Sequence, residues 1–159
     1  MRAGRARGFT LIEVLVVVMI IVVIVGLVGV RLMRGPADIV REESERLALL
    51  LSAAREEAIL QGRVFAFGAG RESYRFLRLE PDGRLKITSD DELLRPARLP
   101  PGIIIEVLQI EGVGEAVLDG LVLLPSGELP AFRVVLAGAG IRWSVVGAPD
   151  GTIRAQAGP

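Results

Sequence analysis

The 159-residue sequence contains no cysteine and no histidine, and these two absences exclude several kinds of site. Without cysteine no disulfide can form, so the soluble part of the chain must be held together by packing alone. Without both residues, the common zinc ligand sets, thiol catalysis and the Ser-His-Asp triad are excluded as well. The sequence also has no Walker loop and no Gly-x-Gly-x-x-Gly fingerprint. We therefore expect no cofactor, no metal and no catalytic residue, and the chain is not expected to be an enzyme.

The sequence also lacks an excess of charge of either sign, with 19 basic and 19 acidic side chains. Beyond residue 8, which leaves out Arg2, Arg5 and Arg7, the side chains sum to 16 minus 19, or −3. Proteins that bind nucleic acids need clustered basic residues. The C-terminal segment from Gly151 onward offers only Arg154. No nucleic-acid partner is therefore expected.

What the chain does have is a long apolar run near its start, from Leu11 to Val30, interrupted only by Glu13. At about 1.5 Å per residue a helix of this length spans the roughly 30 Å hydrocarbon core of a bilayer. The sequence therefore predicts a single membrane-spanning helix. Because basic residues and no acidic residue precede the run, the N-terminus is predicted to be cytoplasmic and the C-terminal part to lie outside.

The apolar run is too long for an ordinary secretory signal, whose apolar core has about 7–15 residues and a small-residue cleavage site. A plain membrane anchor fits the length but leaves Glu13 unexplained. A carboxylate inside a membrane span costs about 2.5–3.5 kcal/mol on insertion scales. Glu13 is therefore predicted to have a partner or a purpose.

The segment Gly8-Phe9-Thr10-Leu11-Ile12-Glu13 resembles the processing site of type IV pilins and of the pseudopilins of type II secretion. The resemblance implies that a prepilin peptidase cleaves between Gly8 and Phe9 and methylates the new Phe9 amine. It also implies that Glu13, the fifth residue of the mature chain, pairs with the N-terminal amine of a neighbouring subunit during assembly. The chain would be a substrate of the peptidase.

After Gly35-Pro36, where a kink is expected, helical periodicity resumes from about Asp38 to Gln61, with Gly62 as the predicted stop. Its charges are read as a solvated face with i,i+4 pairs such as Glu42 with Arg46. Beyond Gly62 the period changes to two and turn residues recur, which predicts two packed antiparallel sheets. The expected strands are 64–67, 74–79, 84–88, 103–110, 121–124, 131–137, 141–146 and 152–155. The segment 89–102 is expected to be a loop with one helical turn at 91–94, and 111–120 a Gly-rich connection.

The residues Pro125-Ser126-Gly127, Phe132, Trp143 and Asp150-Gly151 are similar to the globular domain of the minor pseudopilin H family of type II secretion. The helix sequence from Glu43 to Gly62 also looks like that family. The resemblance implies an α+β fold, in which a long N-terminal helix packs on an antiparallel β-sandwich-like domain with Phe132, Trp143 and Val145 facing the core.

The implied division of the chain is a basic leader at 1–8 and a transmembrane assembly helix at 9–30. An amphipathic continuation at 31–62 and a periplasmic β domain at 63–159 follow. The implied role is a structural subunit near the tip of a short periplasmic pseudopilus that contributes to protein export. Its implied partners are the prepilin peptidase, the other major and minor pseudopilins, the inner-membrane assembly platform and the membrane lipid.

Two alternatives stay open at this point. A minor type IV pilin that serves pilus assembly or DNA uptake would share the processing site. Binding DNA would require a cluster of basic residues, which this sequence lacks. A membrane-anchored enzyme could use the carboxylate pairs Glu56-Glu57 or Asp90-Asp91 for acid and base chemistry. Adjacent carboxylates on a helix surface or in a loop are usually only solvated, and no nucleophile is placed beside them.

Overall fold

The computed structural model describes residues 11–32, 35–112 and 120–158. The chain divides into two compact units, Met1–Gly35 and Pro36–Pro159. The first unit contains the helix α1 (Leu11–Leu32), whose side chains from residue 11 to residue 24 are all exposed. Within the described part of the chain, no helix reaches the length and hydropathy of a membrane span.

The second unit begins with the helix α2 (Pro36–Gln61), which has proline at its first position, where the missing N–H has no intrahelical partner to lose. One face of α2 is buried, and residues Leu47, Leu51 and Ala58 on it have no exposed area. The helix ends at Gln61, and the next residue, Gly62, has a φ of 62°. Because the Arg63 amide donates to the Ala58 carbonyl and the Gly62 amide to the Ile59 carbonyl, the end is a Schellman motif. The predicted stop is confirmed.

Among the described residues, nine strands follow α2, and all pairings among them are antiparallel. The first sheet has the order β3-β2-β1-β6 with β4 beside β2, and the second has the order β5-β7-β8-β9. The first sheet consists of β1 (Phe65–Ala69), β2 (Ser73–Leu79), β3 (Leu85–Ile87), β4 (Ala97–Arg98) and β6 (Leu121–Leu123). The second sheet consists of β5 (Ile103–Ile110), β7 (Phe132–Gly138), β8 (Ile141–Gly147) and β9 (Ile153–Ala157).

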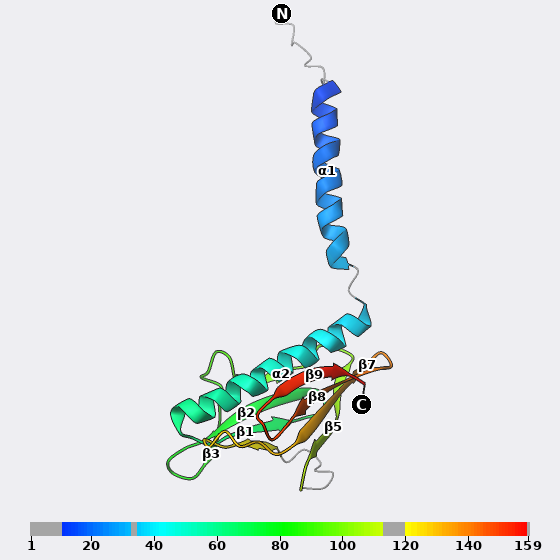
Figure 1. Cartoon of the computed structure of the whole chain (residues 1–159). Helices are drawn as coiled ribbons and strands as arrows, with labels where there is room; N and C mark the ends of the chain where they lie inside the picture. Colours follow the sequence, from blue (N-terminus) through cyan, green and yellow to red (C-terminus); the bar gives the residue numbers. More distant parts are fainter. Residues whose placement is uncertain (1–10, 33–34, 113–119, 159) are drawn as a thin grey trace, which may run out of the picture. The chain divides into compact units, whose positions relative to one another are not determined.

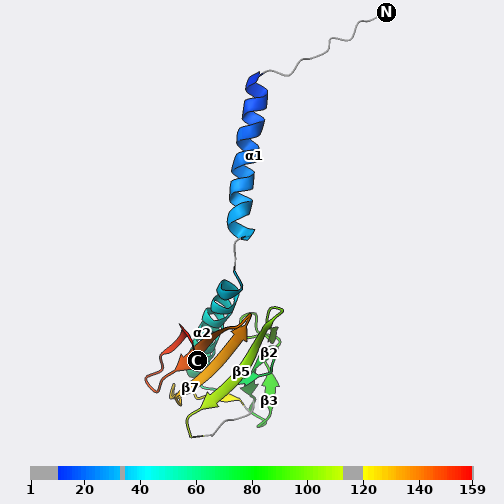
Figure 2. The ribbon, with the colours of Figure 1, turned by 90° about the vertical axis from the view of Figure 1, so that its right-hand side faces the viewer.

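One hydrophobic core joins α2 to the inner faces of both sheets. Figure 1 shows α2 lying across β8 and β9, and the strands β5 and β7 of one sheet and β2 and β3 of the other can be followed in Figure 2. Phe132 and Val145 are buried as predicted, and Trp143 is partly buried against the same core. The predicted α+β architecture of a helix on an antiparallel, sandwich-like domain is confirmed.

The loop before β5 differs from the expectation. The helical turn predicted at 91–94 is absent, because the Asp91 carboxylate accepts hydrogen bonds from the amides of Leu93 (2.8 Å) and Leu94 (2.9 Å) and folds this described segment into a bend. The same stretch contains β4, a two-residue strand that the sequence did not predict. Most of the expected connection at 111–120 lies outside the described residues.

Candidate functional site in the assembly helix and the globular domain

The residues predicted for processing and assembly lie at the start of the chain. Gly8 and Phe9 are outside the described residues. Glu13 lies in the first turn of α1 with its side chain exposed. The positive end of a helix favours a carboxylate at this place. The apolar neighbours of Glu13 are exposed too, from 86% for Leu11 to 46% for Val17. A surface this apolar needs a partner or lipid to cover it.

Arg55 ties α2 to one turn of each sheet. Its Nε donates a hydrogen bond of 2.9 Å to the carbonyl of Gly127, in the turn that follows β6. Its guanidinium also lies against Gly151, in the turn between β8 and β9, where a Cβ atom would clash with Nη2 and come within 2.7 Å of Cζ. Only a residue without a side chain allows this approach. The sequence predicts a solvated face for the charges of this helix, so it does not predict the contact of Arg55 with these turns.

The Gly151 turn is held by its own hydrogen bonds as well. The Thr152 amide donates to the Asp150 carboxylate over 2.8 Å. This hydrogen bond holds the pKa of Asp150 below its usual value, and the charges of Arg154 and Arg55 lower it further. The turn therefore presents a negative charge close to the Arg55 guanidinium.

A second polar contact on α2 joins a buried carboxylate to an exposed guanidinium. Glu43 is only 6% exposed, and its carboxylate accepts two hydrogen bonds from Nη1 of Arg46, at 2.9 and 3.2 Å. The sequence predicts Glu42 as a partner of Arg46 but does not predict Glu43. Tyr74, from the first sheet, lies near this pair. Burial raises the pKa of its hydroxyl, and the positive charge of Arg46 opposes the shift.

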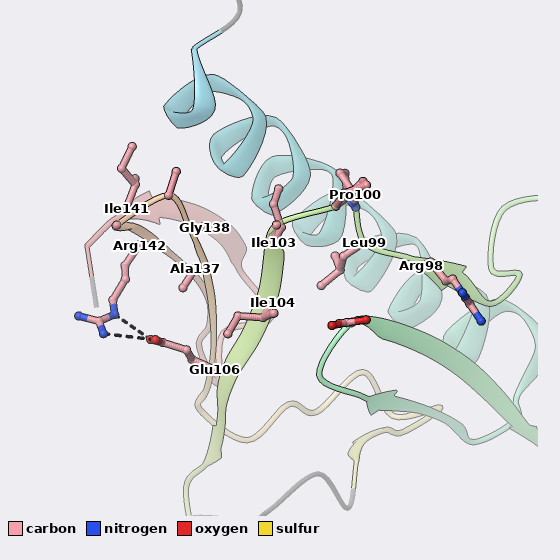
Figure 3. A pocket seen from close by; sticks show the side chains of 15 residues that line it. Arg98, Leu99, Pro100, Ile103, Ile104, Glu106, Ala137, Gly138, Ile141 and Arg142 are labelled. Carbon is pink, nitrogen blue, oxygen red and sulfur yellow. Dashed lines mark hydrogen bonds and ion pairs between the residues drawn. The ribbon is translucent and has the colours of Figure 1, made fainter.

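A wide groove in the described part of the globular domain runs along β5, between the two sheets, with a volume of about 910 Å³. Figure 3 shows Arg142 and Glu106 at one end, Arg98 at the other, and Ile103 and Ile104 between them. Arg142 donates to the Glu106 carboxylate through Nε (2.7 Å) and Nη2 (3.3 Å), and this hydrogen bonding lowers the pKa of Glu106. The charges at this end of the groove are therefore mutually satisfied.

The acidic pairs considered for acid and base chemistry are not arranged as a catalytic site. Glu56 is exposed on α2, and Asp91 is engaged by backbone amides. Neither acidic pair proposed for acid and base chemistry lines the groove along β5. Within the described residues, no group of three or more acidic side chains is arranged to hold a metal ion.

Comparison with known proteins identifies the family. The family model for the type II transport protein GspH matches residues 43–151, which is most of the chain. This chain belongs to the GspH family. The model of the prokaryotic N-terminal methylation motif matches residues 4–29 of the same chain. The GspH-family assignment confirms the resemblance seen in the sequence, and with it the role of a minor pseudopilin of type II secretion.

Individual relatives agree with this assignment. The GspH-family chain is 36% identical over 160 residues to type II secretion system protein H of Pseudomonas aeruginosa, covering 88% of this chain and 87% of that protein. Its fold is similar to the crystal structure of the minor pseudopilin EpsH of Vibrio cholerae, with a TM-score of 0.65 and 22% identity over 77% of this chain and 96% of that one. The fold is also similar to the solution structure of E. coli GspH, with a TM-score of 0.58 and 14% identity over 79% of this chain and 94% of that one.

Proposed function

We propose that this minor pseudopilin is made as a precursor whose leader, residues 1–8, is removed by a prepilin peptidase. Cleavage falls between Gly8 and Phe9, and the new amine of Phe9 is methylated. The match of residues 4–29 to the N-terminal methylation motif supports this, together with the three arginines of the leader. A residue without a side chain before the scissile bond leaves room for the peptidase at that position.

After processing, residues 9–30 anchor the chain in the inner membrane as a single span. The N-terminus stays at the cytoplasmic face, while the helix continuation at 31–62 and the β domain at 63–159 lie in the periplasm. The apolar run and the basic residues ahead of it support this topology. On assembly the helix leaves lipid for the core of a filament, where van der Waals packing against neighbouring helices replaces the acyl chains.

Glu13 directs assembly by pairing with the methylated Phe9 amine of a neighbouring subunit. The amine remains basic after methylation, so the contact joins two charges that would each be costly alone in the membrane. Stabilisation of the helix by a first-turn carboxylate amounts to only about 0.3–1 kcal/mol. That is less than the roughly 2.5–3.5 kcal/mol cost of placing the carboxylate in the span, so a partner is needed.

The chain acts as a structural subunit near the tip of the pseudopilus and catalyses no reaction. Its partners are the prepilin peptidase, the other pseudopilins and the inner-membrane assembly platform, and nucleic acid is not among them. The observation that carries this proposal is the presence, in one chain, of the methylation motif at 4–29 and the GspH match at 43–151. A subunit built this way contributes to export through assembly.

Two substitutions test the proposal in cells that carry the other pseudopilins. Gly8→Glu should leave the leader attached, and mass spectrometry of the membrane-extracted wild type should find Phe9 as its first residue, N-methylated. Glu13→Leu should be inserted and cleaved but should fail to crosslink to the other pseudopilins or to restore secretion, while Glu13→Asp, which keeps the charge, should retain part of both. A mature N-terminus other than Phe9 would refute the processing site. Normal incorporation and secretion by Glu13→Leu would refute the assembly role.

A further inference from the structure

The outer side of the first sheet is apolar across the strands β6, β1, β2 and β3. Strand register places Val122, Ala66, Leu77 and Ile87 in one row, and Leu79 and Leu85 in the row beside it. These positions alternate with core residues such as Phe67 and Phe76, so their side chains point to the side of the sheet away from the core. We call these six residues the apolar face.

Much of the apolar face is in contact with solvent. Leu85 is 55% exposed, Val122 47% and Ile87 41%, although aliphatic side chains of this size are usually buried in folded domains. Leu77 and Leu79 lie between these residues and are half-buried. Contiguous exposed apolar surface marks a contact with another protein or with a membrane.

Two arginines adjoin the apolar face at one end of β2. Register pairs Arg75 with Gly68, and Arg98 of β4 with Ser73, so both arginines lie on the same side of the sheet as Leu77. The two arginines line a depression of about 610 Å³. Within the described part of the chain, neither has an ion-pair partner.

The acidic residues that are near in sequence do not line this depression. Glu72 precedes Ser73 but lines the groove along β5. Asp90 and Glu92 are exposed in the segment between β3 and β4, and neither belongs to the lining. The depression is therefore positively charged, and a carboxylate from another molecule can meet its two guanidinium groups.

The size of the apolar face limits what can cover it. Neighbouring strands lie about 4.8 Å apart and alternate residues along a strand about 6.8 Å apart, so six such side chains cover on the order of 200–300 Å². A stable complex of two free proteins needs about 800 Å² from each partner. This surface is too small to hold a free protein, but it suits a subunit that is already held nearby by its own membrane helix.

The charges and the role of the chain narrow the choice further. An anionic lipid surface is recognised by clusters of basic residues, whereas at the other end of the apolar face Arg63 and Arg78 share the carboxylate of Glu80. The unpaired positive charge on this side of the sheet is thus confined to Arg75 and Arg98. A minor subunit has other pseudopilins as its neighbours, so the expected occupant is a subunit of different sequence.

We propose that the apolar face and its two arginines dock the globular domain of a different pseudopilin, through a surface that carries aliphatic side chains and a carboxylate. The inference rests on the proposed function, because assembly brings the subunits together. Burial of the aliphatic side chains supplies the attraction. The carboxylate that meets Arg75 and Arg98 fixes the register and disfavours subunits that lack it.

Photocrosslinking of the full chain tests this surface in membranes of cells that carry the other pseudopilins. A photoreactive phenylalanine analogue at Ile87 should give an adduct that mass spectrometry identifies as a different pseudopilin. The matched control carries the analogue at Lys86, which is exposed on the same strand but points to the opposite side of the sheet. The analogue at Leu15 in α1 reports assembly through the helix, which the proposed function predicts.

Charge reversal tests the part of the two arginines. Arg75→Glu with Arg98→Glu should lower the yield of the Ile87 adduct about tenfold, because like charges would then face each other. The matched control is Arg133→Glu with Arg154→Glu, which makes the same change of net charge on the second sheet and should leave the yield unchanged. Protease resistance of each full-length variant in the membrane shows that it is folded, and Arg75→Gln, which should give a smaller loss, replaces a double variant that is not.

Three results would overturn the proposal. The Ile87 adduct would not exceed the Lys86 adduct, it would contain lipid or a second copy of this chain, or the arginine substitutions would lower it no more than their control. An adduct from Leu15 to another pseudopilin in any of these cases leaves the proposed function standing without this surface. If neither Ile87 nor Leu15 gives an adduct with another pseudopilin, both the docking surface and the proposed assembly role are refuted.

Discussion

The contact between Arg55 and Gly151 makes a quantitative prediction, because each residue can be changed with and without the other. Arg55→Ala removes a hydrogen bond from a charged donor to the Gly127 carbonyl, a kind of bond that contributes about 1.5–3 kcal/mol. It also removes the packing of the side-chain stem on the turns. Because Arg55 is half-buried, we expect the substitution to lower the free energy of unfolding by about 1.5–2 kcal/mol, at the lower end of that range.

Gly151→Ala should lower the free energy of unfolding for two separable reasons. The φ of 86° at Gly151 is a left-handed conformation, which costs an L residue about 1–2 kcal/mol. The new Cβ would also lie 2.7 Å from Cζ of Arg55 and closer still to Nη2, so the guanidinium must move and its hydrogen bond must weaken. In the Arg55→Ala background only the backbone cost remains. The double variant should therefore lose at least about 0.5–1 kcal/mol less than the sum of the single variants, within the range known for residues in contact.

Urea denaturation of a fragment that begins at Pro36, the start of the second compact unit, measures these differences through the midpoint and the m-value. Gly83→Ala is the matched control, because Gly83 has a similar φ of 79° but nothing lies within 4 Å of the place that a Cβ would occupy. Gly83→Ala combined with Arg55→Ala should be additive. If Gly151→Ala and Arg55→Ala are additive within about 0.5 kcal/mol as well, Arg55 and Gly151 are not energetically coupled, and this prediction is refuted.

Two further predictions concern the second sheet. Gly147→Ala should lower the free energy of unfolding by about 1–3 kcal/mol, because its Cβ would overlap the Phe132 ring, and Phe132→Leu should absorb part of that loss in the double variant. An equal loss in both backgrounds, measured by denaturation, would contradict this packing. The carboxyl of Glu106 should titrate below its ordinary pKa by NMR, and Arg142→Gln should raise that pKa. Because the pKa of Glu106 is lower in the folded protein than in the unfolded chain, its ionised carboxylate stabilises the folded state at pH values above the unfolded pKa. This stabilisation is lost as the pH falls through the folded pKa. Arg142→Gln should therefore also weaken the dependence of folding stability on acid pH. An unchanged Glu106 titration would show that the pair does not persist in solution.

The elements that sequence reasoning predicted well are those fixed by local chemistry. The end of α2 is predicted by helical spacing and by the glycine after Gln61. The longer strands are predicted by alternation of apolar residues between turn residues. The short strand β4 escaped prediction because two residues, Ala97 and Arg98, have no period of their own and pair only through β2. Local propensity also failed at Asp91, where side-chain hydrogen bonds to the backbone replaced the expected helical turn.

The charged residues of α2 show why the candidate site was only partly predictable. Periodicity assigns a residue to a face of the helix, but whether a charge there is solvated depends on which other elements come near it. Glu43 is buried and lies near Tyr74 of the first sheet, and Arg55 lies beside Ala54 and reaches turns more than 70 residues away in sequence. Glycines that follow Ser126 and Asp150 were the only local signal that something approaches those turns closely.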